Sequence, residues 1–201
     1  MPGYTRAMGP AATRADIELL LLSFENGLRL RRLDLRAVNL SGLDLRGSDF
    51  TGSTLTETDF TGCRLEGVCL SGCNFSGASF RNAGMRSANL NGAIGRGAVF
   101  DGADLRDASL VKALLPATSF RRTTLRNARL TLADLSRAIF VQADLSLAEL
   151  SGANLSQADL RKAAMQSATL HVDQLPLLNL DQEQRATLRA LTPGAQYYGY
   201  P

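Results

Sequence analysis

A period of five residues runs through most of this chain of 201 residues. From position 30 to position 170, every fifth residue is Leu, Phe or Met, and Gly95 is the one exception. These 29 centres comprise 19 Leu, 7 Phe, 2 Met and 1 Gly, and no insertion or deletion shifts the frame. The period matches neither the 3.6-residue repeat of a helix face nor the two-residue repeat of a strand face. The chain is therefore a repeat protein, and the repeat determines its fold.

A second period, of 20 residues, lies on top of the first. Five of the seven Phe centres stand 20 residues apart. Twenty residues are four repeats, which predicts a coil of four short sides in which every centre points inward. Stacked coils then bring these five rings to one inner corner as a core ladder: Phe60, Phe80, Phe100, Phe120 and Phe140. The residue two places before a centre is mostly Ala, as expected for a second inward position in a narrow core.

The residue two places after a centre is often Gly, which predicts tight turns at the corners. Two positions break the pattern. Gly95 is a centre without a side chain, and Pro116 follows the centre Leu115. At the first position, either Ile94 rotates into the core or the side bulges outward. We interpret both irregularities as local flaws that the coils tolerate, and the alternative is that they mark a contact site.

The centres carry a recurring motif, Ala-Asp-Leu or Ala-Asn-Leu. It stands at 88–90, 103–105, 133–135, 143–145, 153–155 and 158–160. With this motif, a repeat that stays in frame over about 141 of the 201 residues resembles the pentapeptide-repeat family. The resemblance implies an all-β solenoid, a right-handed quadrilateral parallel β-helix of about seven coils.

The two ends of the chain lack the period and are predicted to be caps. Residues 1–12 are expected to be disordered. Residues 13–28 are predicted to contain a capping helix, because the open end of a solenoid exposes core and unpaired strand edges. Thr13 and Asp16 have the spacing of a capping box. The alternative is an amphipathic helix that binds a partner. The coils are assigned to residues 29–172, and a C-terminal cap and tail to residues 173–201.

The five-residue frame is interpreted as lost after Leu170. Asp181 is expected to begin a C-terminal capping helix that runs to about Leu191. The aromatic tail, from Tyr197 to Pro201, is expected to be exposed. The resemblance implies, as a hypothesis, a homodimer that forms through this C-terminal region.

Residues that commonly carry catalysis or bind cofactors are scarce. His171 is the single histidine, and no catalytic triad spacing surrounds it. Cys63 and Cys73 fall at small inward positions and Cys69 at an outward one, so we interpret them as packing residues rather than metal or redox ligands. We therefore expect no enzyme activity, no cofactor and no metal. No apolar run reaches the length of a transmembrane helix and no signal-peptide core stands out, so a cytoplasmic location is expected.

The charged residues sort by repeat position. Most acidic residues stand directly before a centre, and most basic residues stand one or two places after one. Folding by 20 aligns the basic residues in two stripes, which are the candidate interaction face. The first stripe, interrupted by Glu66, consists of Arg46, Arg86, Arg106 and Arg126. The second, flanked by Arg122 and Lys162, consists of Arg81, Arg121 and Arg161. The alternative is a solvated surface in which Arg pairs with Asp on neighbouring coils, each pair contributing little to stability.

These observations favour a non-enzymatic scaffold, a rigid rod whose flat sides bind a protein partner of acidic character. The resemblance implies an alternative, because some family members mimic duplex DNA, modulate DNA gyrase or topoisomerase IV, and protect against quinolones or peptide toxins. That activity depends on an acidic surface, whereas this chain has a net charge of +3 and a pI of about 9.0.

Two further partner classes are disfavoured. Direct nucleic-acid binding by the arginines lacks support, because the coils offer no outward aromatic platform for bases and no helix for a groove. A membrane partner is not expected. The excess of Arg over Lys, 20 to 2, is typical of a GC-rich bacterial source.

Overall fold

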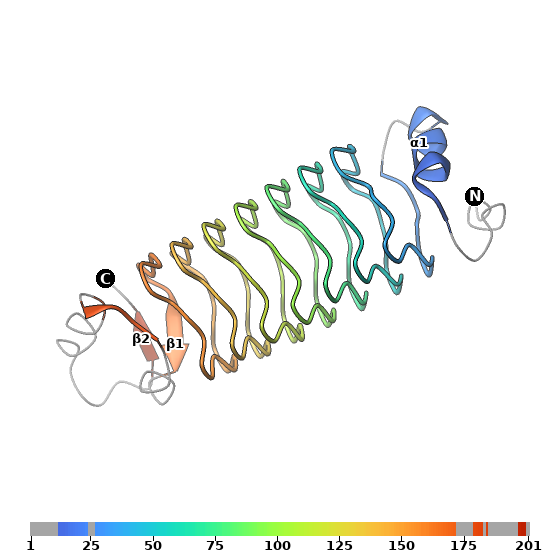
Figure 1. Ribbon diagram of the computed structural model, residues 1–201. Helices are drawn as coiled ribbons and strands as arrows, with labels where there is room; N and C mark the ends of the chain where they lie inside the picture. Colours follow the sequence, from blue (N-terminus) through green and yellow to red (C-terminus); the bar gives the residue numbers. More distant parts are fainter. Residues whose placement is uncertain (1–11, 24–26, 172–178, 183, 185–196, 200–201) are drawn as a thin grey trace.

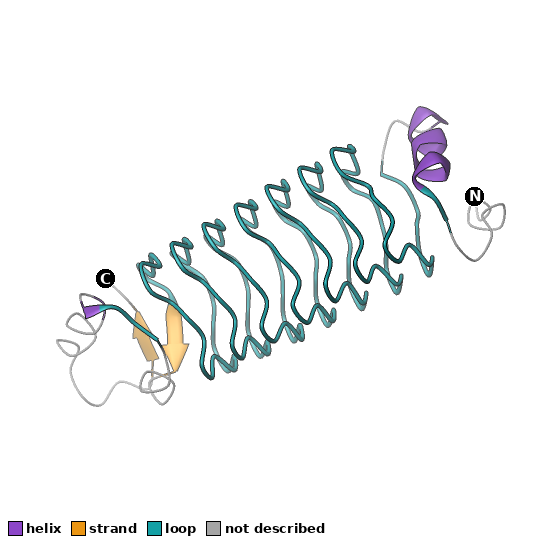
Figure 2. Cartoon of the chain, in the orientation of Figure 1, coloured by secondary structure: helices purple, strands orange, loops and turns teal. Residues whose placement is uncertain are grey.

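The computed structural model describes residues 12–23, 27–171, 179–182, 184 and 197–199. Its main body is a stack of coils that follow one another in sequence order (Figure 1). A helix, α1 (Arg14–Ser23), lies at the N-terminal end. Two short strands, β1 (Thr169–His171) and β2 (Tyr197–Gly199), lie at the C-terminal end. The coils between these elements consist of turns and loops (Figure 2).

Neighbouring coils are joined by isolated parallel β-bridges between residues 20 positions apart. The series runs in steps of five residues, without a gap, from Arg29↔Asp49 to Glu149↔Thr169. Each bridge residue stands directly before a centre, so a single residue on each side carries the bridge. Four repeats therefore make one coil, as the 20-residue period predicts. The expected all-β solenoid is built almost wholly of turns and one-residue bridges.

The backbone of each side bonds to the coils above and below it. The N–H of the centre Leu45 donates to the C=O of Arg64 (2.8 Å), and the N–H of Arg64 donates to the C=O of Leu43 (3.0 Å). At the corner, the N–H of Ser48 donates to the C=O of Leu45 (3.1 Å), which closes a β-turn. Because buried backbone groups must be paired, this pattern lets a five-residue unit stack without long strands.

The second residue of each corner has a positive φ. Gly102 has a φ of +71°, and Leu147 takes the same place with a φ of +63°. A positive φ at the second central position is that of a type II turn, which favours Pro at the first. Pro116 occupies that first position, and its C=O still accepts a hydrogen bond from the N–H of Gly97 (3.1 Å). Pro116 therefore fits its corner and does not interrupt the coils.

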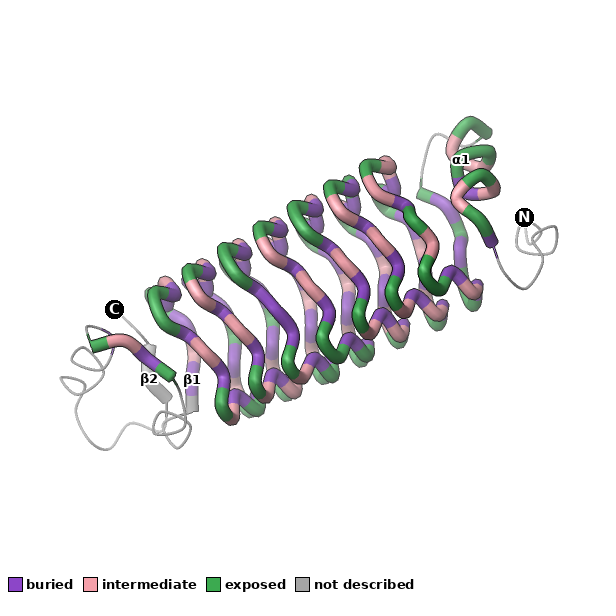
Figure 3. The backbone as a smooth tube through the Cα atoms, in the orientation of Figure 1, coloured by how far each residue is buried: buried purple, intermediate pink, exposed green. Residues whose placement is uncertain are grey.

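The centres form the core, and buried positions recur at short, regular intervals along each coil (Figure 3). The five Phe rings spaced 20 residues apart, from Phe60 to Phe140, are fully buried and stack on one another. Their centroids lie 4.7–5.1 Å apart, and the planes of neighbouring rings differ by 3–9°. Phe50 and Phe75 meet this ladder edge-on, at 5.9 Å from Phe60 and 5.3 Å from Phe80. A continuous aromatic column therefore fills one inner corner.

The inward position two places before a centre accepts Ser, Thr or Cys for a specific reason. Six such side chains donate a hydrogen bond to the C=O of the centre 23 residues earlier. The Cys63 and Cys73 thiols, for example, bond to the carbonyls of Leu40 (3.0 Å) and Phe50 (2.8 Å). The six donors are Ser53, Thr58, Cys63, Cys73, Thr118 and Thr123. Each of these six buried polar groups thereby has a partner, which offsets the cost of burying it.

Neither alternative expected at Gly95 occurs. Ile94 stays on the outside, 43% exposed, and keeps its bridges to Asn74 and Leu114, so residues 92–97 do not bulge. The core space is filled by Phe75 instead. A Cβ on Gly95 would lie 2.0 Å from Cε2 of that ring and 2.8 Å from Cδ2 of Leu115. The bulk missing from one coil is supplied by the coil before it.

Helix α1 begins as the sequence predicts. The N–H of Thr13 donates to Oδ2 of Asp16 (2.8 Å), and the N–H of Asp16 donates to Oγ1 of Thr13 (3.3 Å), which is a capping box. Ile17 is fully buried, and Leu20 and Leu21 pack against the core. The helix, Arg14–Ser23, lies within the expected range 13–28, and residues 24–26 lie outside the described part of the chain.

The C-terminal end departs from the expectation in two ways. The frame is not lost at Leu170, since Asn179 pairs with Asp159 and Leu180 is buried like a centre. The backbone of β2, which belongs to the tail, runs antiparallel to β1 and occupies its outer edge, a pairing that the sequence analysis did not include. The helix expected from 181 to about 191 lies largely outside the described residues. The pairing of β2 with the edge of β1 blocks the addition of a further strand there.

Candidate interaction surface

Four arginines that follow a centre are held by an aspartate two residues before them. In each case the sequence reads Asp, Leu, Arg, and the guanidinium folds back onto the carboxylate of the same repeat. Arg46, for example, donates from Nε to Oδ1 of Asp44 (2.8 Å) and from Nη2 to Oδ2 (2.7 Å). The four pairs are Asp34–Arg36, Asp44–Arg46, Asp104–Arg106 and Asp159–Arg161. We refer to them as closed arginines, because two hydrogen bonds between a guanidinium and a carboxylate compensate much of the charge of each group.

These pairs shift the titration of the carboxyl groups. The hydrogen bonds from Arg106 hold the pKa of Asp104 below its ordinary value, against a partial burial that raises it. The pKa of Asp159 is lowered in the same way by Arg161. The pKa values of Asp34 and Asp44 are likewise lowered by their arginines. The charges of the closed arginines are therefore largely compensated within their own repeat.

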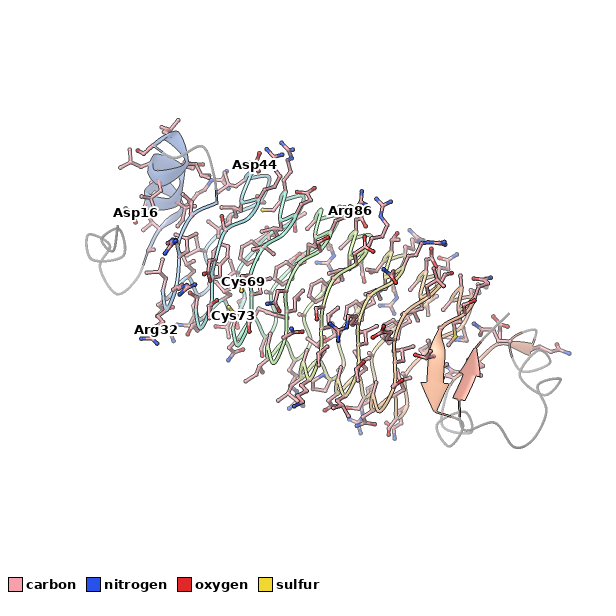
Figure 4. The ribbon with its side chains drawn as sticks, turned by 180° about the vertical axis from the view of Figure 1, so that it is seen from behind. Asp16, Arg32, Asp44, Cys69, Cys73 and Arg86 are labelled. Atoms are coloured by element: carbon pink, nitrogen blue, oxygen red, sulfur yellow. The ribbon has the colours of Figure 1, made fainter. Side chains whose placement is uncertain are left out.

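The first predicted stripe is thus not a free basic surface. Arg46 and Arg106 are closed, and Nη2 of Arg86 lies 3.9 Å from Oδ2 of Asp107. Only Arg126 makes no ion pair with a described residue. Figure 4 shows Asp44 and Arg86 along the same edge of the coils. Acidic and basic groups alternate along this edge.

The second predicted stripe is different. Arg161 is closed by Asp159, but Arg81 and Arg121 follow Ser79 and Ser119 instead of an aspartate. Nη1 of Arg121 lies 3.0 Å from Oγ of Ser119, and Nη1 of Arg81 lies 3.5 Å from Oγ of Ser79. Neither guanidinium makes an ion pair with a described residue. We refer to Arg81, Arg121 and the neighbouring Arg122 as open arginines.

The open arginines surround a hollow of about 430 Å³ on one corner of the stack. The hollow spans four successive coils. Its lining consists of Arg81, Asn82, Asp101, Gly102, Arg121, Arg122, Val141 and Gln142. Asp101 is the single carboxylate of this lining, and its Oδ1 accepts hydrogen bonds from the hydroxyl of Ser119 and the N–H of Arg121 (3.1 Å). The lining therefore carries more positive than negative charge.

A second exposed feature is apolar and lies on another side. Ile94 and Leu114, which pair across neighbouring coils, are 43% and 47% exposed. Pro116 stands at the adjacent corner, so the two irregularities seen in the sequence meet on the same surface. Arg96, at the same corner in the coil before, makes no ion pair with a described residue.

Sorting the charged residues by side tests for an acidic face. A side is taken as the five residues that begin with a bridge residue, such as 44–48, together with their equivalents every 20 residues along the chain. Over residues 29–170, the side that begins with Asp44 carries five acidic and five basic residues, and the side that begins with Asp34 carries three of each. The side of Arg29 has two acidic and five basic residues, and the side of Asn39 has three and five. None of the four described sides has an excess of negative charge.

The cysteines have the surroundings of packing residues. Burial raises the pKa of the Cys63 and Cys73 thiols to about 11. Cys69 is half-buried, with its Sγ 3.3 Å from Oγ1 of Thr51. Within the described part of the chain, no three His, Cys, Asp or Glu side chains are grouped so as to hold a metal ion. The described helix is also too short to cross a bilayer.

The model of the pentapeptide-repeat family matches this chain in eight copies, which together extend over residues 29–166. The chain belongs to the pentapeptide-repeat family. No curated protein matches it.

Several solved pentapeptide-repeat structures resemble the chain. A trypsin-treated variant of QnrB1, a plasmid-mediated fluoroquinolone resistance protein, is 25% identical, with 81% of this chain and 93% of that chain covered and a TM-score of 0.44. HetL from the cyanobacterium Nostoc sp. strain PCC 7120, involved in heterocyst differentiation regulation, is 23% identical, with 78% and 86% covered and a TM-score of 0.33.

In this pentapeptide-repeat protein, the identity of one residue separates the closed arginines from two of the open ones, Arg81 and Arg121. Asp two places before Arg closes Arg36, Arg46, Arg106 and Arg161, and Ser in that place leaves Arg81 and Arg121 open. The sequence therefore contained the signal that divides the candidate face. The sequence analysis missed it because it compared residues 20 apart, on neighbouring coils, rather than residues two apart within a repeat.

Proposed function

We propose that this protein is a non-enzymatic scaffold that binds a protein partner through the sides and corners of its coils. The observation that carries the proposal is the group of open arginines, Arg81, Arg121 and Arg122, which line one hollow together. Their Cα positions are set by a bridge ladder that continues without a gap from Arg29 to Thr169. A fixed arrangement of cations that make no ion pair with a described residue is suited to recognising a partner, because little ordering is needed on binding.

Affinity capture from a lysate of the source organism tests this function. We expect the immobilised protein to retain at least one protein reproducibly at physiological salt, and a heat-denatured bait to retain none of it. Baits that carry changes on a single side then identify the side that binds. Retention of the same proteins by the native and the denatured bait would overturn the scaffold proposal.

Modulation of DNA gyrase or topoisomerase IV, with protection against quinolones, is the alternative function implied by the family resemblance. The charges argue against it, since none of the four described sides is acidic overall. A supercoiling assay with purified gyrase, with and without a fluoroquinolone, decides between the two functions. Inhibition or rescue at low-micromolar protein would favour the alternative.

Homodimerisation through the C-terminal region is a separate proposal. It rests on the family resemblance, and β1 already pairs with Glu149 on one edge and with β2 on the other. A second copy would therefore have to add elsewhere or displace β2. A monomeric mass in light scattering at high protein concentration would remove this proposal.

A further inference from the structure

We propose that the hollow between Arg81, Arg121 and Arg122 binds an extended acidic segment of a protein partner, with the carboxylates of that segment on the open arginines. The inference rests on the proposed scaffold function and names the chemistry of its partner. It concerns one corner of the stack and leaves the rest of the surface unassigned.

The hollow exists because of the residues at four corners in succession. Gly102 carries no side chain, and the Asn82 amide lies in the place that a Cβ would take, with its Oδ1 2.4 Å from that position. Arg81 and Asn82 belong to the coil before Gly102, Arg121 and Arg122 belong to the coil after it, and all four line the hollow. Val141 adds an apolar surface beside them. A volume of about 430 Å³ is in the range of sites that bury a small ligand or a few residues of a chain.

The arginines are oriented by neutral acceptors and keep donors for a ligand. Arg121 bonds to a serine hydroxyl, and Nε of Arg122 donates to Oε1 of Gln142 (3.2 Å). A guanidinium has five N–H donors in a fork that fits a carboxylate, so most of them remain available. Oδ1 of Asp101 does not pair with the guanidinium groups of these arginines. It accepts hydrogen bonds from the hydroxyl of Ser119 and from the backbone N–H of Arg121 instead.

Charge complementarity and spacing together favour an extended acidic segment. Arg81 and Arg121 are two coils apart, which corresponds to about 9.6 Å at about 4.8 Å per layer. Three residues of a polyproline II segment advance about 9.3 Å and return to the same face. Carboxylates at every third position of such a segment would therefore meet both arginines. The second oxygen of Asp101 is suited to accept a backbone N–H of the same segment.

Fluorescence anisotropy with a labelled peptide tests the inference. The probe is fluorescein-(Pro-Ser-Asp)4, and the matched probe replaces each Asp by Asn. We expect the Asp probe to bind the full-length protein at least tenfold more tightly than the Asn probe at 50 mM salt. Binding of both probes with equal affinity, or of neither, would overturn the proposal. A partner captured from lysate in that case would leave the scaffold function standing.

Two charge-matched variants locate the site. The triple variant Arg81→Gln, Arg121→Gln and Arg122→Gln removes three open arginines and should weaken the Asp probe at least tenfold. The triple variant Arg36→Gln, Arg46→Gln and Arg106→Gln removes three closed arginines on other sides of the coils, and the affinity should change less than twofold. Circular dichroism and the melting temperature verify that both variants fold. Equal losses of affinity in the two variants would show a general charge effect and contradict the site.

A labelled 12-nucleotide single-stranded DNA tests the other class of partner. If this DNA binds more tightly than the Asp probe and depends on the same arginines, the hollow is a nucleic-acid site and the proposed peptide site is wrong.

Discussion

The ring of Phe75 fills the core space above Gly95, where every other repeat from position 30 to position 170 has a Leu, Phe or Met side chain. A Cβ on Gly95 would come within 2.0 Å of Cε2 of Phe75. The ring also packs edge-on against Phe80 and Phe100, at centroid separations of 5.3 and 5.9 Å. Gly95 is therefore the complement of a large neighbour rather than a defect of the repeat.

Restoring the repeat at this position should destabilise the protein. Gly95→Leu forces a side chain into occupied space, and we expect a loss of about 1–3 kcal/mol in the free energy of unfolding. Adding Phe75→Leu makes room, so the double variant should lose less than the sum of the two single variants. Urea unfolding followed by circular dichroism measures all three. A Gly95→Leu variant as stable as the unchanged protein would contradict this account of the core.

The aromatic ladder predicts that equivalent Phe residues differ in their contribution. Phe100 stacks on Phe80 and Phe120 and meets Phe75 edge-on, whereas the one ring contact found for Phe50 within the described residues is Phe60. Aromatic pairs contribute about 0.5–1.5 kcal/mol beyond their buried area. Phe100→Leu should therefore cost at least about 1 kcal/mol more than Phe50→Leu. Urea midpoints of the two variants give the comparison, and equal losses would mean that the ring geometry adds nothing to burial.

The five-residue and 20-residue periods predicted most of the fold, because both are set by packing in the core. The five-residue period places one inward side chain on each side of the coil, and the 20-residue period gives each coil four sides. The ladder of Phe rings follows from the two periods together. The filling of Gly95 by Phe75 could not be derived in the same way, because it depends on ring orientation. The pairing of β2 with β1 was also missed, since residues 169–171 and 197–199 share no local pattern that links them.

The candidate interaction face was predicted only in outline. Counting residues by 20 found the two stripes, but stripes of Cα positions do not show which guanidinium groups are bound. Arg161 and Arg121 stand on the same corner, and Asp159 closes the first while Ser119 leaves the second open. The choice is made inside each repeat, by a contact over two residues.

The three cysteines should differ in reactivity in the folded protein. Burial raises the pKa of Cys63 and Cys73 to about 11, so about one thiol in a thousand would be ionised at pH 8. Cys69 is half-buried, with part of its surface accessible. Treatment with iodoacetamide should modify Cys69 first and the other two only after denaturation. Mass spectrometry of tryptic peptides locates the adducts, and early modification of Cys63 would show that the core opens locally.

The closed arginines predict how stability depends on acid. The pKa values of Asp104 and Asp159 are lowered in the folded protein by their arginines, so each group binds its proton less readily there than in the unfolded chain. Such a group contributes stability that is fully present above the unfolded pKa, about 3.9, and is lost as the pH falls through the folded pKa. The contribution of these carboxyl groups should therefore be constant from pH 7 to about pH 5 and decline below about pH 4.

Urea midpoints measured between pH 7 and pH 3 test this dependence. The double variant Asp104→Asn and Asp159→Asn should be less stable at pH 7 and should lose less stability on acidification than the unchanged protein. Asp144→Asn is the matched control, because the Asp144 carboxylate accepts a hydrogen bond from the Ser146 backbone N–H (2.9 Å) and pairs with no described arginine. It should leave the acid-dependent loss close to that of the unchanged protein. Parallel curves for the double variant and the unchanged protein would mean that the closed pairs are too well solvated to affect folding.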